Sequence, residues 1–242
     1  MRLKRTFLAL ILFGIAFGYV EAAVVVYLRT IFVPIRQKTF RTVAPNDLFP
    51  LLTAEHLRAA GPEYVGLLAI ELGREVATIV MLAAAGLAIA GNFRQWLAGF
   101  MIAFGVWDIF YYVFLRLLIG WPESLMTLDL LFLVPVPWVG PVIAPVIVSL
   151  SMILAGWAIL WYEAAGQPLR FRRLDWVLVF VGGLTVIVAF CWDWRQLTAG
   201  GWPGSFNWPV YAMGEAIGAA GFLHALSSRP RNAKNGQSCK TR

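Results

Sequence analysis

The sequence predicts an all-α membrane protein, a polytopic bundle of about six transmembrane helices. Of its 242 residues, 60% are hydrophobic and only 14% are charged, whereas soluble domains carry about a quarter charged residues. Apolar runs near the ~20 residues that cross a bilayer recur along the chain. The positive charges lie mostly outside these runs, where membrane topology and anionic headgroups explain them. The net charge of +7 therefore indicates a lipid bilayer as partner and not nucleic acid.

The first span is predicted at Phe7–Leu28, which is 22 residues long. The basic start MRLKR and the apolar stretch FLALILFGIAFG are also typical of a cleaved signal peptide. However, the apolar run continues through AAVVVYL, and cleavage would discard half of a full-length span. We therefore expect a retained membrane helix.

The remaining spans follow from hydropathy. Residues 128–140 are the exception: Pro135 and Pro137 would break a helix there, so this segment is predicted to be broken or re-entrant, buried in protein or lining a cavity. A single transmembrane domain is expected over residues 1–226, followed by a disordered, basic, cytoplasmic tail at 227–242. The predicted spans after the first are Tyr64–Ala90, Trp96–Ile119, Gly140–Tyr162, Asp175–Trp194 and Asn207–Leu226.

The distribution of Lys and Arg predicts the orientation. With six spans and an inner N-terminus, the inner segments hold 12 of these residues and the outer segments hold six. Because cytoplasmic loops carry the excess of positive charge, both termini are expected in the cytoplasm. The segment from Arg29 to Glu63 opposes this bias, since it contains five of the outer six.

Two segments match without a gap: IAFGYVEAAVVVYLR at 15–29 and IAFGVWDIFYYVFLR at 102–116. Seven of fifteen positions are identical, and Glu21 aligns with Asp108. Apolar helices resemble one another through composition alone, but the paired acid and the paired final arginine favour a duplication of helix hairpins. Such internal repeats occur in transporters.

Charged side chains at membrane depth cost ~2.5–3.5 kcal/mol each on insertion scales and usually face the interior of a bundle. Helical spacing puts Glu71, Arg74 and Glu75 on one face. Asp108, Tyr112 and Arg116 form a second stripe. The sequence therefore predicts a buried polar site in the outer half of the membrane, comprising Glu21, Glu71, Arg74, Glu75, Asp108, Tyr112, Arg116, Asp129 and Glu215.

The charges of this site do not balance. Five carboxylates within the spans face two arginines, and a dry cluster with three excess negative charges is not stable. Protonation, a bound cation or entering water would compensate. Glu21 and Asp108 are expected to share a cavity, with one of them protonated. The alternative is structural, with the two arginines joining neighbouring helices by ion pairs.

Several other kinds of chemistry are excluded. The chain has two histidines and two cysteines, Cys191 and Cys239, without metal-ligand spacing. It has no zinc-protease, nucleophile-elbow or phosphate-loop motif. The residues therefore indicate no metal site, and they leave open which cofactor, if any, the protein uses.

Four segments carry a resemblance: GYVEAAVVVYL, ELGREVATIVML, FGVWDIFYYVFLRLLIGWP and LDLLFLVPVPWVGPVIAPV. They resemble a widespread family of small bacterial multi-pass inner-membrane proteins that is described only as uncharacterised. The likeness covers roughly residues 10–160. It implies a bacterial inner-membrane location and supplies no activity, cofactor or site residue.

Three functional hypotheses remain open. The first is a proton- or cation-linked carrier of a small solute, with the acidic residues as its coupling site. The second is a membrane-embedded enzyme acting on a lipid-linked substrate from the periplasmic side, with Tyr111 or Tyr112 and the acids as acid–base groups. The third is a non-catalytic subunit or assembly factor of a membrane complex.

Overall fold

The computed structural model describes residues 3–40 and 47–228 of the chain. The prediction of an all-α protein is confirmed, because eight helices make up most of this part and the only strands in it form one short hairpin. Most of the predicted tail, from residue 229 onward, lies outside the described residues. The elements are α1 (Leu3–Thr39), α2 (Ala54–Ala60), α3 (Pro62–Ala88), α4 (Phe93–Ile119), β1 (Leu128–Phe132), β2 (Trp138–Pro141), α5 (Ile143–Ala164), α6 (Arg173–Phe190), α7 (Trp194–Thr198) and α8 (Trp208–Ser227).

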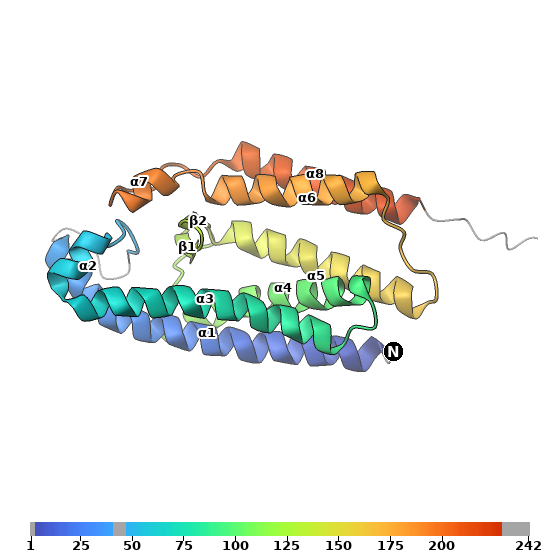
Figure 1. The fold of residues 1–242 in the computed structure, drawn as a ribbon, viewed down its shortest axis with the longest axis horizontal. Helices are drawn as coiled ribbons and strands as arrows, with labels where there is room; N and C mark the ends of the chain where they lie inside the picture. The colour runs from blue at the N-terminus through green and yellow to red at the C-terminus, as the bar shows by residue number, and fades with distance from the viewer. Residues whose placement is uncertain (1–2, 41–46, 229–242) are drawn as a thin grey trace, which may run out of the picture.

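Four helices, α1, α4, α5 and α6, are long and apolar enough to cross a membrane. The helices predicted as the second and sixth spans also form, as α3 with 27 residues and α8 with 20. The start of α1 and the end of α8 lie at the same end of the molecule (Figure 1). The small elements α2, α7 and the hairpin lie at the opposite end, which we call the hairpin end.

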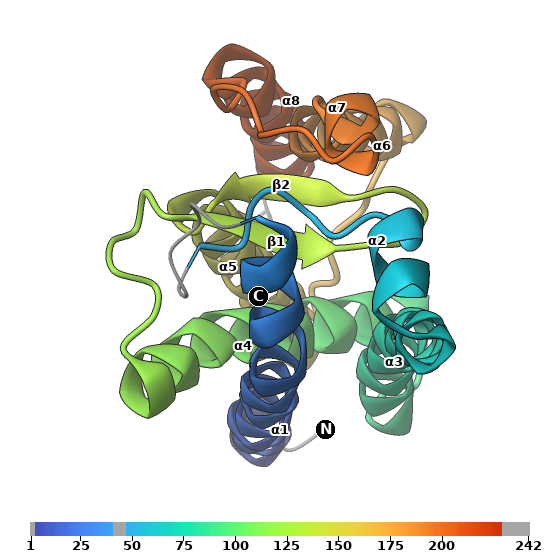
Figure 2. The same cartoon turned by 90° about the vertical axis from the view of Figure 1, so that its left-hand side faces the viewer.

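The helices form two layers (Figures 1 and 2). One layer contains α1, α3, α4 and α5, with α4 in contact with the other three. The second layer is the pair α6 and α8, which pack mainly against each other. The hairpin lies between the two layers at its end of the molecule (Figure 2).

Glycines allow the helices of the first layer to approach α4 closely. A Cβ at Gly18 would lie 3.0 Å from the Trp107 carbonyl oxygen, and one at Gly105 would lie 2.5 Å from the Ser149 carbonyl oxygen. Small residues at such crossings are the usual way in which membrane helices pack. The two matching segments, 15–29 and 102–116, therefore lie against each other; whether they arose by duplication stays a prediction.

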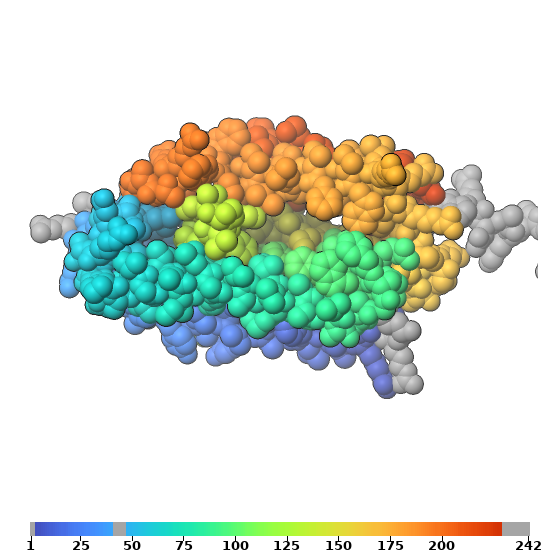
Figure 3. Space-filling model, viewed as in Figure 1, coloured from blue at the N-terminus to red at the C-terminus, as the bar shows by residue number. Residues whose placement is uncertain are grey.

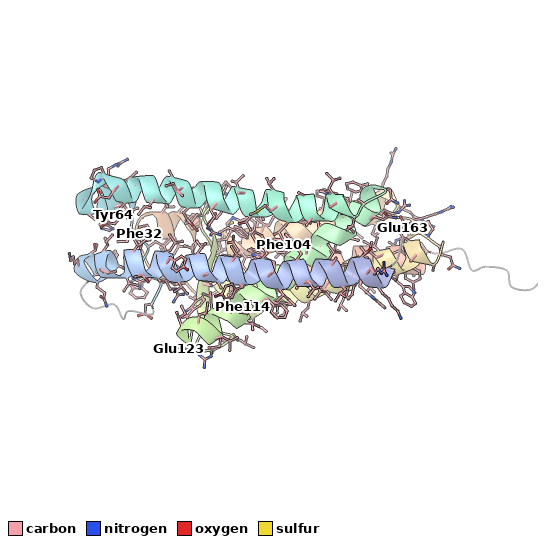
Figure 4. All side chains as sticks on the ribbon, turned by 90° about the horizontal axis from the view of Figure 1, so that it is seen from below. Phe32, Tyr64, Phe104, Phe114, Glu123 and Glu163 are labelled. Atoms are coloured by element: carbon pink, nitrogen blue, oxygen red, sulfur yellow. The ribbon has the colours of Figure 1, made fainter. Side chains whose placement is uncertain are left out.

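Helix α3 approaches α4 only at the end opposite the hairpin. There a Cβ at Gly86 would lie 2.7 Å from the Phe100 nitrogen. From this contact α4 runs diagonally away from α3, as Figure 2 shows. At the hairpin end α3 lies alongside α1 instead, where the rings of Phe32 and Tyr64 are 6.4 Å apart (Figure 4). Helix α3 therefore packs against α4 at one end and lies beside α1 at the other.

Two segments differ from the sequence-based expectation. Helix α1 continues past Leu28 to Thr39, through Pro34, although the apolar run ends earlier. Residues 128–140, expected to be a broken or re-entrant piece, are not helical; together with Pro141 they contain an antiparallel hairpin in which Leu128 pairs with Pro141 and Leu130 pairs with Val139. The strands satisfy their backbone groups by pairing with each other, so this apolar, proline-rich segment needs no helix.

Candidate functional site

A cavity of about 1210 Å³ lies between the two helical layers. Figure 3 shows the hollow that leads into it between α6 and the helices α3 and α4. Side chains from α1, α3, α4, α5, α6, α8 and the hairpin line it. Eight of the nine predicted site residues are among them: Glu21, Glu71, Arg74, Glu75, Asp108, Tyr112, Asp129 and Glu215.

Arg74 is the centre of an ion-pair network between α1 and α3. Its guanidinium binds Glu21, and its Nε donates to Glu71 at 2.8 Å. Thr78 also donates from its hydroxyl to Glu21 at 2.9 Å. Glu21 is only 4% exposed, so its charge is compensated by this one arginine and one hydroxyl.

The hydrogen-bond partner of Glu75 is not part of the Arg74 network. Both of its carboxylate oxygens accept from the backbone nitrogen of Leu133, at 2.8 and 3.1 Å. Leu133 directly follows β1, so this bond ties the tip of the hairpin to α3. Both residues line the cavity, and their contact helps to fix the position of the hairpin.

Two further carboxylates are held by hydroxyl groups. Ser149 of α5 donates to Asp108 at 2.8 Å. Tyr112 donates to Asp129 of β1 at 2.9 Å, and the Leu130 nitrogen donates to the same carboxylate. Burial raises the pKa of Asp129 to about 6, and the hydrogen bond from Tyr112 and the charge of Arg29 limit the rise.

Glu21 and Asp108 both line the cavity, as predicted, but each has its own partner. Glu21 binds Arg74 and Thr78 of α3, whereas Asp108 accepts from Ser149 of α5. That one of these two acids carries a proton stays a prediction.

The residues just described, from Glu21 to Asp129, form what we call the polar end of the cavity. Two predicted residues lie apart from it. Arg116 does not line the cavity; its Nη1 donates to the carbonyls of Gly120 and Pro122 and caps the end of α4. Glu215 lines the cavity from the second layer and accepts from Ser151 at 3.2 Å. Neither residue contributes to the Arg74 network.

Two arginines of the cavity were assigned to an outer loop by the sequence analysis. Arg29 and Arg36 line the cavity because α1 continues beyond the apolar run. The guanidinium of Arg29 lies 4.1 Å above the centre of the Trp121 ring. A signal for them exists in the sequence: Glu21, Arg29 and Arg36 follow at seven- and eight-residue intervals, which is the spacing of one helical face.

A further pair joins α6 to α8 away from the cavity's polar end, between a buried aspartate and a partly exposed histidine. His224 Nδ1 contacts the fully buried carboxylate of Asp175. This pair and a glycine seam hold the second layer together: Cβ atoms at Gly182 and Gly214 would lie 2.5 Å from the Gly218 nitrogen and 2.8 Å from the Val186 nitrogen, respectively.

These features define the class of the molecule: a helical protein with membrane-spanning candidates around a deep cavity. Its hairpin end is polar, and its remaining walls are mostly apolar, with Glu215 and Ser151 as exceptions. Comparisons with models of known protein families, with curated proteins and with solved structures found no match. Among residues 3–40 and 47–228, no group of three or more histidines, cysteines and acids is arranged to hold a metal ion.

Proposed function

We propose that this protein takes an amphipathic, lipid-like molecule from the bilayer into its central cavity and acts on the polar end of that molecule. The molecule would enter through the hollow between the layers. Its polar end would lie at the hairpin end of the cavity, and its apolar chain along the apolar walls. This corresponds to the membrane-embedded, lipid-linked alternative of the sequence analysis.

The size and the lining of the cavity carry this proposal. Its volume of about 1210 Å³ exceeds the ~300–1,000 Å³ typical of small-ligand pockets. A proton or a small ion needs far less space. Away from the polar end the walls are mostly apolar, with Glu215 and Ser151 as exceptions, and they include Met101, Phe104, Met152, Ala155, Val179 and Phe222. Such walls suit a hydrocarbon chain and do not suit a polar solute.

The polar end supplies groups that can transfer protons to or from a bound head. Tyr112 with Asp129 and Ser149 with Asp108 are hydroxyl–carboxylate pairs at hydrogen-bond distance. A carboxylate that accepts from a hydroxyl can receive a proton through it, as general acid–base chemistry requires. Arg29 adds a positive charge beside them.

The second candidate is the proton- or cation-linked carrier of a small solute. It is favoured by the excess of acid at the polar end, where Glu21, Glu71, Glu75, Asp108 and Asp129 face Arg29, Arg36 and Arg74. In this case Asp108 would be the coupling group, since its only hydrogen-bond partner in the described part of the chain is neutral Ser149.

The proposed arrangement in the membrane uses six spans, with α3 and α8 in addition to the four strongly apolar helices. At ~1.5 Å per residue, helices of 27 and 20 residues reach ~40 and ~30 Å, enough for a ~30 Å hydrocarbon core. We place the protein in a bacterial inner membrane with both termini in the cytoplasm and the hairpin end toward the periplasm.

A topology experiment checks this orientation. A reporter fused after Arg242 is expected to be cytoplasmic, and one inserted between α7 and α8, after Pro203, is expected to be periplasmic. An insertion near Asn46 should also read as periplasmic. The reverse pattern at these sites would contradict the assignment of the polar end to the outer half of the membrane.

Filling the cavity tests the proposed function directly. Gly183 lines the cavity, and a Cβ there meets no atom within 4 Å, so Gly183→Leu begins its side chain in open space at the cavity wall. We expect native mass spectrometry of the purified wild-type protein to detect a bound amphiphile. Gly183→Leu should lower the fraction of protein carrying it by at least about fivefold, while the protein stays folded.

Gly73→Leu is the matched control. A Cβ at Gly73 also meets no atom within 4 Å, but this glycine of α3 does not line the cavity. The control should retain the amphiphile. Equal occupancy in the two variants, or no bound amphiphile in the wild type, would contradict the proposal.

A further inference from the structure

One carboxylate oxygen of Asp108 is free at the polar end of the cavity. The side chain lines the cavity and is only 8% exposed. Its Oδ2 accepts from Ser149, whereas Oδ1 has no hydrogen-bond partner among residues 3–40 and 47–228. Oδ1 is not one of the completely buried polar atoms without a partner, so it keeps accessible surface. Both oxygens accept a hydrogen bond within the same residues in each of the other four carboxylates of the polar end, Glu21, Glu71, Glu75 and Asp129.

An aromatic face of α4 adjoins this free oxygen. Phe104, Trp107 and Tyr111 follow one another at helical spacing and line the cavity, with ring centres 5.2 and 6.4 Å apart. Tyr111 follows Asp108 by three residues, so their Cβ atoms are neighbours on the helix at about 5–6 Å. The Tyr111 hydroxyl also has no hydrogen-bond partner in the described part of the chain, and it too keeps accessible surface. Two oxygens that can accept a hydrogen bond therefore lie open beside aromatic rings.

The charges of the polar end decide what kind of donor fits these oxygens. Five carboxylates line this end of the cavity with three guanidinium groups. Arg74 binds two of the acids, Arg29 acts on a third, and Arg36 lies near the charge of an aspartate outside the cavity. Glu75 and Asp108 bind only neutral groups, a backbone N–H and a serine hydroxyl. A buried carboxylate needs a compensating charge, and a cation in the cavity would supply it.

We infer that the head of the bound amphiphile carries a primary ammonium group, which donates to Oδ1 of Asp108 and lies against the aromatic face of α4. The inference rests on the proposed function and names the class of the head. An ammonium group has three donors and one positive charge, so it matches both the free oxygens and the excess of acid. Cations also bind over aromatic rings within about 6 Å of the ring centre. An anionic head would be repelled by the acids, and an uncharged head would leave them uncompensated.

Equilibrium binding to the full-length protein in phosphatidylcholine nanodiscs tests the inference. The probes are dodecylamine, dodecanol and dodecyl phosphate, which share one alkyl chain and differ in the head, and empty nanodiscs correct for partitioning into lipid. We expect dodecylamine to bind at least about tenfold more tightly than dodecanol, since a hydrogen bond to a charged group is worth about that factor or more. Dodecyl phosphate should bind most weakly. This comparison needs only the wild-type chain.

Asp108→Asn tests the proposed partner of the ammonium group. The substitution removes the charge and keeps an oxygen that can accept from Ser149. It should weaken dodecylamine binding by at least about tenfold and leave dodecanol binding unchanged. If this variant does not fold, Tyr111→Phe replaces it; the loss of one hydroxyl should weaken dodecylamine binding by about threefold. Unchanged dodecylamine affinity in the folded variant overturns the inference.

Asp193→Asn is the matched control. Asp193 does not line the cavity, and its carboxylate accepts from the backbone nitrogen of Gly204, which asparagine can also do. The same substitution at this position should leave the affinities for all three probes unchanged. An equal loss of dodecylamine binding in both variants would contradict the assignment of the head to Asp108.

The three probes also separate this inference from the proposed function. If dodecanol or dodecyl phosphate binds as tightly as dodecylamine, the ammonium inference is overturned, while loss of that probe in Gly183→Leu would uphold the proposed function. If no probe binds and Gly183→Leu changes nothing, both are overturned.

Discussion

Arg74→Leu is expected to be the most destabilising substitution of a charged residue in this protein. It removes the cation that binds both Glu21 and Glu71 and leaves Glu21, at 4% exposure, with only the Thr78 hydroxyl. Breaking a buried ion pair by deleting one partner costs about 3–5 kcal/mol. The yield of folded protein and its thermal unfolding in detergent measure the loss.

Three variants complete this experiment. Arg94→Leu removes a pair with Glu163 in which the arginine side chain is 40% exposed, and it should cost at most about 1 kcal/mol. Glu71→Gln keeps the Arg74–Glu21 pair and should be mild. Glu21→Gln in the Arg74→Leu background should recover part of the lost stability, because it removes the unpaired charge. If Arg74→Leu is as mild as Arg94→Leu, the carboxylates are hydrated and the network does not hold α1 to α3.

Gly182→Leu is expected to separate the second layer. A Cβ at this position would lie 2.5 Å from the backbone nitrogen of Gly218 and 2.7 Å from the carbonyl oxygen of Gly214. Backbone atoms of a packed helix cannot move aside as a flexible side chain can. Overpacking of this kind costs about 1–3 kcal/mol or more, and a lower unfolding temperature of the purified protein reports it.

The adjacent glycine provides the comparison for this prediction. Gly183→Leu adds the same atoms one residue further along α6, into open space, and should leave the unfolding temperature nearly unchanged. Because leucine favours a helix more than glycine does, a slight stabilisation is also consistent. Equal destabilisation by both variants would mean that a glycine in α6 matters for the helix itself and not for its contact with α8.

Hydropathy predicted the helices well, because their apolar runs are long. It could not predict the extension of α1 to Thr39, since residues beyond Leu28 are amphipathic and include Pro34. Hydropathy could not predict the hairpin either. Pairing of Leu128 with Pro141 depends on contacts between strands, whereas a proline-rich apolar segment is equally typical of a broken helix.

For the candidate site, the cost of burying charge identified most of the cavity's carboxylates correctly. The same argument missed Arg29 and Arg36, which were counted as loop residues because the helix was ended too early. It also placed Arg116 in the cluster from spacing alone, whereas that side chain caps its own helix. Hydrogen-bond partners such as the Leu133 nitrogen could not be predicted, because the sequence does not show which backbone N–H group will donate to a side chain.

The order of the elements along the chain has a consequence for synthesis. Every contact of the Arg74 network, the bond from Leu133 to Glu75 and the two hydroxyl–carboxylate pairs lie between residues 21 and 149. The helices α6 and α8, which pack mainly with each other, come afterwards. As the chain leaves the ribosome, the polar groups of this network can therefore find their partners within the first layer before the second layer has been made, and the last two helices close over a polar centre that is already assembled.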